Sequence, residues 1–174
     1  MQQIKVIIGL GNPGRQYTNQ RHNIGFRVLD ALAHKYHGAW QERENMMYST
    51  ITIHDRALLL IKPQTFMNSS GTVIPYLKKQ GMAAENILVV HDELEVPFGT
   101  LKHKMGGSHK GHNGLRSLIE ALGTADFGRL RFGISRPENR DEVPQYVLQD
   151  FRDMSLVETN IDKAVTLIEE LVTD

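Results

Sequence analysis

Residues 5–14 read KVIIGLGNPG, a short apolar run that passes directly into a loop containing three glycines. Residues 57–61 and 87–90 are apolar runs of the same kind, bounded by turn residues and followed by polar side chains. Short apolar runs with such boundaries are typical of strands that are buried on both faces. The sequence therefore predicts a sheet whose central strands include residues 5–8, 57–61 and 87–90.

Helical patterns alternate with these strands. Residues 28–36, 115–122 and 157–172 each carry apolar side chains at the spacing of one helix face. Asn23 is expected to cap the first of these helices, and Asn113 is expected to open the second. Strands that alternate with helices predict an α/β fold.

Two further segments, residues 49–53 and 129–134, alternate apolar and polar residues as half-buried strands do. Pro75 leaves open where a helix starts within residues 66–80. Together the elements predict one catalytic domain over residues 1–174, a single-domain three-layer sandwich. Its sheet is expected to be twisted and mixed (largely parallel), with helices on both faces.

The composition excludes several kinds of chemistry. The 174 residues contain no cysteine, which rules out disulfides, thiolate metal sites and a cysteine nucleophile. The first residues lack the pattern of a signal peptide, and no run reaches the length of a membrane span. We expect a soluble protein of the cytoplasm.

Charge is segregated along the chain although the net charge is zero. Between residues 102 and 140 eight basic residues face three acidic ones, whereas nine acidic and two basic residues follow from residue 141 onward. A local basic face can bind a polyanion even when the total charge is neutral. Chance clustering on a solvated surface is the alternative explanation.

Polar residues follow three of the predicted strands, where ligands bind in open α/β sheets. The glycine pattern of residues 9–14 also fits a dinucleotide fingerprint, but residues 15–20 show no helical periodicity and the nearest acid, Asp30, lies within a predicted helix. A tight turn that needs glycine is a further explanation. These readings stay open on the residues alone.

His22 is the candidate general base, because the chain has neither a cysteine nor a Gly-x-Ser-x-Gly elbow. If Asn23 caps the helix, the helix dipole favours the neutral imidazole that a base requires. Asp92, which follows a strand, could accept the other ring N–H and fix the tautomer. This pairing requires that the two strand ends adjoin.

The glycine-rich residues 104–114 form a third candidate element. Their backbone N–H groups, the nearby lysines and the helix that follows suit a phosphate or an oxyanion. A metal held by His103, His109 and His112 is the competing hypothesis, although this loop contains no acidic ligand.

Five motifs in register resemble the bacterial peptidyl-tRNA hydrolases over nearly the whole chain. They are GLGNPG with Tyr17, RHNIGF (21–26), KPQTFMNSSG (62–71), HDEL (91–94) and GHNGLRS (111–117). The resemblance implies a monomeric, metal-independent hydrolase without a cofactor. Its substrate would be peptidyl-tRNA, whose ester between the peptide and the tRNA 3′ end is cleaved. Many members continue beyond the final helix, so the resemblance assigns no contact to such a tail.

The resemblance also implies roles for single residues. His22 would be the general base, Asp92 the acid that orients it, and Asn113 the residue that places the water and the oxyanion. The implied substrate-binding residues are Asn12, Tyr17, Met67, Asn68 and His112, and the implied clamp on tRNA phosphate consists of Lys102, Lys104 and Arg131. An RNA-binding module without catalysis and a nucleotide-dependent enzyme are the competing functions.

Overall fold

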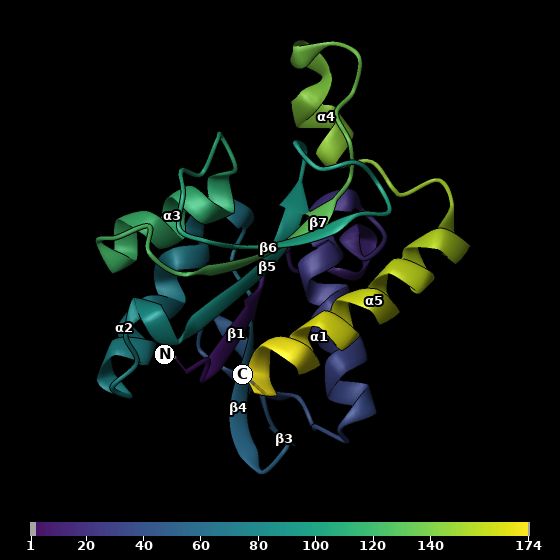
Figure 1. Ribbon diagram of the computed structural model, residues 1–174. Coiled ribbons are helices and arrows are strands. Elements are labelled where there is room, and N and C mark those ends of the chain that lie inside the picture. Colours follow the sequence, from purple (N-terminus) through teal and green to yellow (C-terminus); the bar gives the residue numbers. More distant parts are fainter. Residues whose placement is uncertain (1–2, 174) are drawn as a thin grey trace.

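The computed structural model describes residues 3–173, in which seven strands form one mixed sheet (Figure 1). The strand order is β2-β3-β4-β1-β5-β7-β6. Strands β4, β1, β5 and β7 run parallel, while β2, β3 and β6 pair antiparallel at the two sides. The strands are β1 Val6–Gly9, β2 Gln41–Arg43, β3 Met46–Ile53, β4 Arg56–Pro63, β5 Ile87–Glu93, β6 Leu101–Met105 and β7 Gly128–Gly133.

Helices cover both faces of this sheet, which confirms the predicted α/β architecture (Figure 1). The helices are α1 Ile24–Lys35, α2 Ile74–Lys79, α3 Asn113–Leu122, α4 Val143–Val147 and α5 Met154–Thr173. Helices α1 and α5 pack on one face, whereas α2 and α3 pack on the other. Within the described part of the chain, no helix combines the length and the apolar character that a bilayer crossing requires.

The central strands read as continuous apolar runs because both of their faces are buried. In β5, Leu88 and Val90 belong to the core under α1 and α5, while Ile87 and Val89 belong to the core under α2 and α3. The same alternation recurs in β1. Burial on two sides explains why these strands were the easiest elements to predict.

Several boundaries differ from those predicted. Asn23 precedes α1, but its side chain makes no capping hydrogen bond to the helix. Asn113 is the first residue of α3, and His112 is the residue that caps it. Pro75 occupies the first turn of α2, which answers where that helix begins. The sequence patterns did not predict β2, β6 or α4.

Glycines let α1 approach the strand ends closely. A side chain on Gly25 would clash with the backbone of Leu10 and Val90, and one on Gly9 would clash with the backbone of Gly25. Within the glycine-rich loop after β1, only Gly14 has a positive φ, of 120°. The fit of α1 against β1 and β5 places the residues just before this helix next to the carboxyl end of β5.

Candidate active site

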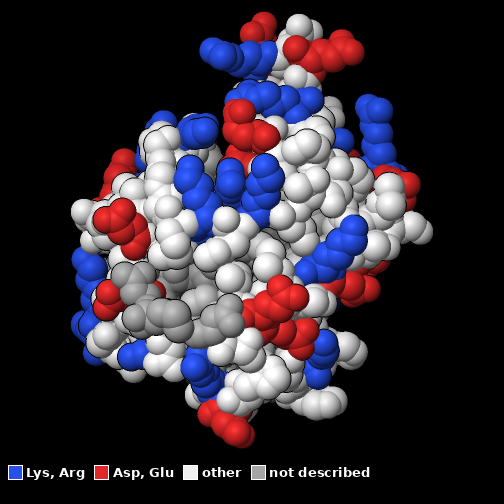
Figure 2. Space-filling view, in the orientation of Figure 1, with Lys and Arg blue, Asp and Glu red and all other residues white. Residues whose placement is uncertain are grey.

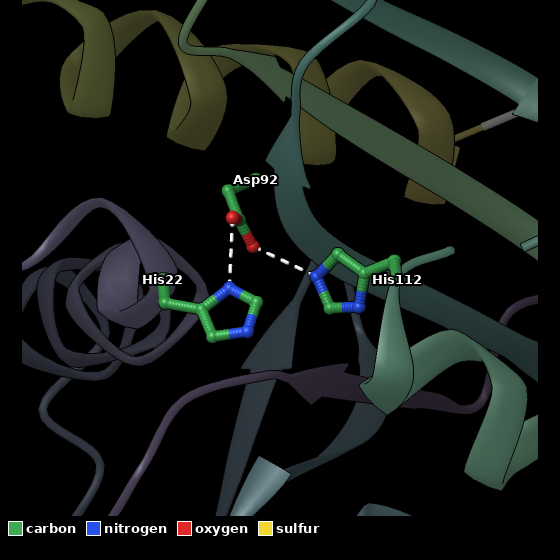
Figure 3. A group of neighbouring side chains, drawn as sticks. All are labelled: His22, Asp92 and His112. Atoms are coloured by element: carbon green, nitrogen blue, oxygen red, sulfur yellow. Dashed lines mark hydrogen bonds and ion pairs between the residues drawn. The ribbon is translucent and has the colours of Figure 1, made fainter. Parts of the chain in front are cut away.

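Two histidines from distant parts of the chain share the carboxylate of Asp92 (Figure 3). Asp92 lies at the carboxyl end of β5, and His22 lies in the 3₁₀ turn Arg21–Asn23 that leads into α1. The His22 Nδ1 atom is 2.8 Å from Asp92 Oδ2, and the His112 Nε2 atom is 2.8 Å from Asp92 Oδ1. The contact between His22 and Asp92 that the sequence analysis required is therefore present.

Hydrogen bonding fixes the tautomer of each imidazole. An ionised carboxylate only accepts, so His22 donates from Nδ1 and keeps Nε2 as the atom with a free lone pair. His112 donates from Nε2, and its Nδ1 accepts the backbone N–H groups of Gly114 and Leu115 at 3.1 and 3.3 Å. The arrangement of these bonds requires His112 to be neutral.

The pKa values of the pair move in opposite directions. Burial alone lowers the pKa of His22, but the charge of Asp92 and the hydrogen bond to it outweigh burial and raise this pKa above its ordinary value of 6.5. Burial raises the pKa of Asp92, yet His22 and His112 together hold it well below its usual range. The helix dipole was expected to favour the neutral imidazole, whereas the Asp92 carboxylate favours the charged one.

A third histidine lies behind the other two. His91 is fully buried, its Nδ1 donates to the backbone carbonyl of Asp92 at 2.8 Å, and its ring stands edge-on to His112 with centroids 5.4 Å apart. Burial lowers the pKa of His91 to about 3. His91 is therefore neutral, and it forms one wall behind His112.

A cavity of about 470 Å³ opens beside this cluster. His22, Asp92, His112 and Asn113 are among the residues that line it. Its apolar walls are Leu94, Leu115, Val143, Pro144 and Val147, so the predicted catalytic residues and the short helix α4 border the same space. An elongated substrate that reaches His22 could extend into this cavity.

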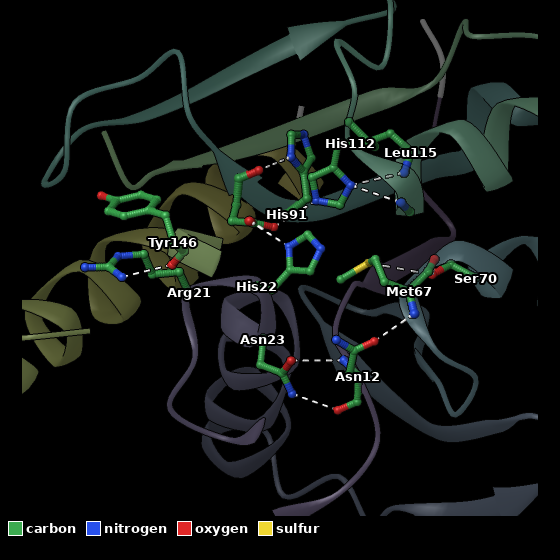
Figure 4. Close-up of polar contacts among 12 residues, drawn as sticks. Asn12, Arg21, His22, Asn23, Met67, Ser70, His91, His112, Leu115 and Tyr146 are labelled. Carbon is green, nitrogen blue, oxygen red and sulfur yellow. Dashed lines mark hydrogen bonds and ion pairs between the residues drawn. The ribbon is translucent and has the colours of Figure 1, made fainter. Parts of the chain in front are cut away.

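On another side of His22, Asn23 holds the loop that follows β1 (Figure 4). The Asn23 side chain accepts the backbone N–H of Asn12 at 3.0 Å and donates to the Asn12 carbonyl at 2.8 Å. The Asn12 side chain in turn accepts the N–H of Met67 at 2.7 Å. Sequence reasoning missed this role of Asn23, because an Asn before a helix suggests a cap.

The remaining predicted substrate residues lie on the segments that follow β1 and β4. Met67 is buried, and its sulfur packs against Gly114 at the start of α3, a position where any side chain would collide with it. Asn68 follows on the surface, and Tyr17 is half-buried in the turn Arg15–Tyr17 after the first loop. Among the described residues neither Asn68 nor Tyr17 has a side-chain hydrogen bond.

The predicted clamp residues lie on β6 and β7, where the strand register pairs Lys102 with Arg131 and Lys104 with Arg129. Arg129 is buried, and its guanidinium donates to the carbonyls of Gly107, Ser108 and Ala125. Arg129 therefore holds the glycine-rich loop within residues 104–114 instead of facing solvent. In Figure 2 basic side chains gather near the centre of the viewed face, with acidic ones directly adjacent.

Two alternative functions for this site were a dinucleotide-binding loop and a metal site. The loop after β1 leads into the three-residue turn Arg15–Tyr17 instead of the helix that a dinucleotide fingerprint requires. The ligand atoms of His22, Asp92 and His112 lie within 4.8 Å of one another, as metal ligands could. In this structure both imidazoles instead contact the Asp92 carboxylate directly, at hydrogen-bond distances of 2.8 Å.

Known proteins share both the sequence and the fold of this chain. The family model for peptidyl-tRNA hydrolase matches residues 6–174. A peptidyl-tRNA hydrolase of Geobacter sulfurreducens is 45% identical over 174 residues, covering 97% of this chain and 89% of the relative. One from Hydrogenobaculum sp. is 44% identical over 164 residues, covering 92% of this chain and 87% of the relative.

The crystal structure of the peptidyl-tRNA hydrolase of Acinetobacter baumannii superposes with a TM-score of 0.94 at 37% identity. The match covers 99% of this chain and 90% of that one. Sequence and structure agree along almost the entire length, and the resemblance drawn from the five motifs is confirmed. The chain belongs to the peptidyl-tRNA hydrolase family.

Proposed function

We propose that His22, oriented by Asp92, is the general base with which this chain hydrolyses peptidyl-tRNA, the reaction of its family. One observation carries the assignment. The bond to Asp92 fixes the proton on Nδ1 and leaves the Nε2 lone pair available on a side chain that lines the cavity. A base must offer a free lone pair within reach of the proton that it removes.

The proposed reaction needs no covalent intermediate. His22 Nε2 takes a proton from a water molecule, and the water oxygen attacks the ester carbonyl carbon. The bond between that carbon and the ribose oxygen breaks, and the imidazolium returns its proton to the leaving oxygen. Asp92 stabilises the imidazolium while it exists, as its effect on the pKa of His22 indicates. General base catalysis of this kind contributes about 10²–10⁴-fold.

Polar side chains around His22 would hold the substrate. We assign Asn113, which lines the cavity, to the water and the developing oxyanion. Asn12 and Asn68 would bind the 3′ end of the tRNA and the peptide backbone, with Tyr17 and Met67 lining the same surface. The rigid support that Asn12 receives from Asn23 is consistent with a binding role.

The basic strands β6 and β7 would bind tRNA phosphates through Lys102, Lys104 and Arg131. Lys102 and Arg131 lie opposite each other in the strand register, and neither has an acidic partner among the described side chains. Cations without a partner are the ones that gain most from a phosphate contact. We further propose that the chain acts as one monomeric domain in the cytoplasm, without a metal.

Replacement of His22 tests the assignment. His22→Ala should bind tRNA with normal affinity, while single-turnover hydrolysis of an N-acylated aminoacyl-tRNA falls by about 10²–10⁴-fold. His34→Ala, an exposed histidine near the end of α1, is the matched control and should react at the normal rate. Turnover within a few-fold of normal in His22→Ala would contradict the assignment.

A further inference from the structure

His112 connects Asp92 on β5 with the start of α3, although the sequence resemblance implied a substrate-binding role for it. We propose that His112 is a positioning residue that acts through Asp92 and sets the basicity of His22. The proposal rests on the function proposed above, because it concerns how the same base is tuned. It adds a role in which His112 touches neither the water nor the ester.

The two ring nitrogens of His112 serve two different elements. Nδ1 caps α3 by accepting the N–H groups of Gly114 and Leu115, and Nε2 donates to Asp92 on β5 (Figure 4). Asn113, the next residue, is the first residue of α3 and lines the cavity. One neutral imidazole therefore fixes the position of Asn113 relative to the carboxylate that orients His22.

His22 and His112 both donate a hydrogen bond to the Asp92 carboxylate, so they share its negative charge. Each carboxylate oxygen accepts one imidazole N–H at 2.8 Å, and Asp92 is almost completely buried. A hydrogen bond from His112 disperses part of the negative charge that otherwise acts on His22. Loss of that bond leaves the whole carboxylate to His22, so the pKa of His22 rises and the base is protonated over a wider range of pH.

Other ionisable groups near His22 are less well placed to tune it. His91 stays neutral behind His112, and Arg21 donates to the carbonyl of Tyr146 and stacks on its ring. In the cavity Arg136 pairs with Glu95. The remaining charged or ionisable residues that line it with His22 are Glu93, His109, Lys110 and Arg140, and none has a hydrogen bond to His22.

Two substitutions separate the two bonds of His112. Asn is a favoured helix cap, so His112→Asn should keep α3 in place, while its shorter side chain cannot also donate to Asp92. His112→Ala removes both bonds. His34→Asn, near the end of α1, removes an exposed histidine whose side chain contacts neither Asp92 nor α3, and it is the control.

The decisive measurement is the pH dependence of kcat/KM for N-acylaminoacyl-tRNA, together with the NMR titration of the His22 imidazole. His112→Asn should move both the acid limb and the His22 titration upward by about 0.5–1 pH unit. It should also lower the plateau of kcat/KM roughly tenfold. His34→Asn should change neither the acid limb nor the plateau. An acid limb and a His22 titration that stay in place, or that move downward, would overturn the proposal.

A second readout is independent of activity. The ¹⁵N shifts of the His112 ring in the wild-type protein at neutral pH should report a protonated Nε2 and an unprotonated Nδ1. The opposite tautomer, or a doubly protonated ring, would also overturn the proposal. If instead His22→Ala remained active, the proposed base would fail, whatever the His112 titrations showed.

Discussion

Asn23 illustrates how a residue next to the proposed base contributes without facing the substrate. It is 2% exposed, and both of its side-chain hydrogen bonds go to the backbone of Asn12. An N-cap would instead have accepted an N–H of α1. Because Asn23 holds the backbone of Asn12, it also sets the position of Asn12, which is a proposed substrate-binding residue.

Replacement of Asn23 should therefore affect both stability and substrate binding. Asn23→Ala leaves the N–H and C=O of buried Asn12 without partners, which costs about 1–3 kcal/mol in the free energy of unfolding. KM for peptidyl-tRNA should rise more than kcat falls, because the base itself keeps its bond to Asp92. Urea unfolding and steady-state kinetics check the two effects, and an unchanged KM would argue against the support of Asn12.

Single residues could be predicted unevenly from the sequence. The contact between His22 and Asp92 could be anticipated, because few side chains in a cysteine-free chain are candidates for a base and its orienting acid. The bonds of His112 and Asn23 could not be found, because each depends on which backbone groups the fold brings within reach. Both residues cap or precede a helix in the sequence, and only the tertiary structure shows where their ring or amide atoms point.

Strands β6 and β7 carry the proposed clamp. The sequence did not predict β6, because its exposed lysines interrupt the alternation of apolar residues that indicates a strand. The charge of residues 102–140 pointed to a basic face, but it did not show which cations are free. Arg129 turned out to be buried and bound to loop carbonyls, whereas Lys102 lies exposed on the surface. Sequence alone counts charges, and burial decides which of them can meet a phosphate.

The lysines of β6 should contribute binding and little chemistry. Lys102→Ala combined with Lys104→Ala should raise KM, reduce the slope of log KM against log salt by roughly one to two, and leave kcat nearly unchanged. Lys79→Ala combined with Lys163→Ala, on α2 and α5, is the control of equal charge. A salt slope equal to that of the wild-type chain would place the tRNA surface elsewhere.

Arg129 should stabilise the conformation of the glycine-rich loop that contains Gly107 and Ser108. Arg129→Met leaves the carbonyls of Gly107 and Ser108 without their donor, which should destabilise the fold by about 1–3 kcal/mol. The loosened loop should let trypsin cleave faster at Lys110, which is exposed on this loop, and the rate of cleavage there measures the effect. Arg131→Met, two residues further along β7, is the control and should leave that rate unchanged. Equal cleavage in both variants would refute the anchoring role.

At the scale of the whole molecule, the parallel strands determine where the chemistry occurs. The carboxyl ends of β1 and β5 adjoin because the two strands pair in parallel. Asn12 and Asp92 therefore lie at the same edge of the sheet, and α1 brings His22 to it. The buried apolar strands could be predicted from the sequence, but their order in the sheet could not. The polar edge strands and the short helix α4 had no comparable signal in the sequence.

The His22–Asp92 pair should also stabilise the fold over a defined range of pH. The lowered pKa of Asp92 contributes stability that is complete above its unfolded value of 3.8 and is lost as pH falls below it. The raised pKa of His22 contributes stability that is complete below 6.5 and is lost as pH rises through the higher folded value. The contributions overlap between pH 3.8 and 6.5.

Asp92→Asn should therefore differ most from the wild-type chain inside that window. The difference in the free energy of unfolding, measured by urea at several pH values, should be largest near pH 5 and smaller both near pH 2.5 and near pH 8.5. A difference that is constant with pH would show that the pair is not charged in the folded protein.

The most direct test of the proposed base is the pH profile of kcat/KM for the wild-type chain and for Asp92→Asn, since this quantity reports the pKa of the free enzyme. The wild-type acid limb should lie above pH 6.5, because Asp92 raises the pKa of His22. In Asp92→Asn, burial alone acts on His22, so the limb should move below pH 6.5 while the plateau falls by at least about 10²-fold. An acid limb that remains in place in Asp92→Asn would contradict the account.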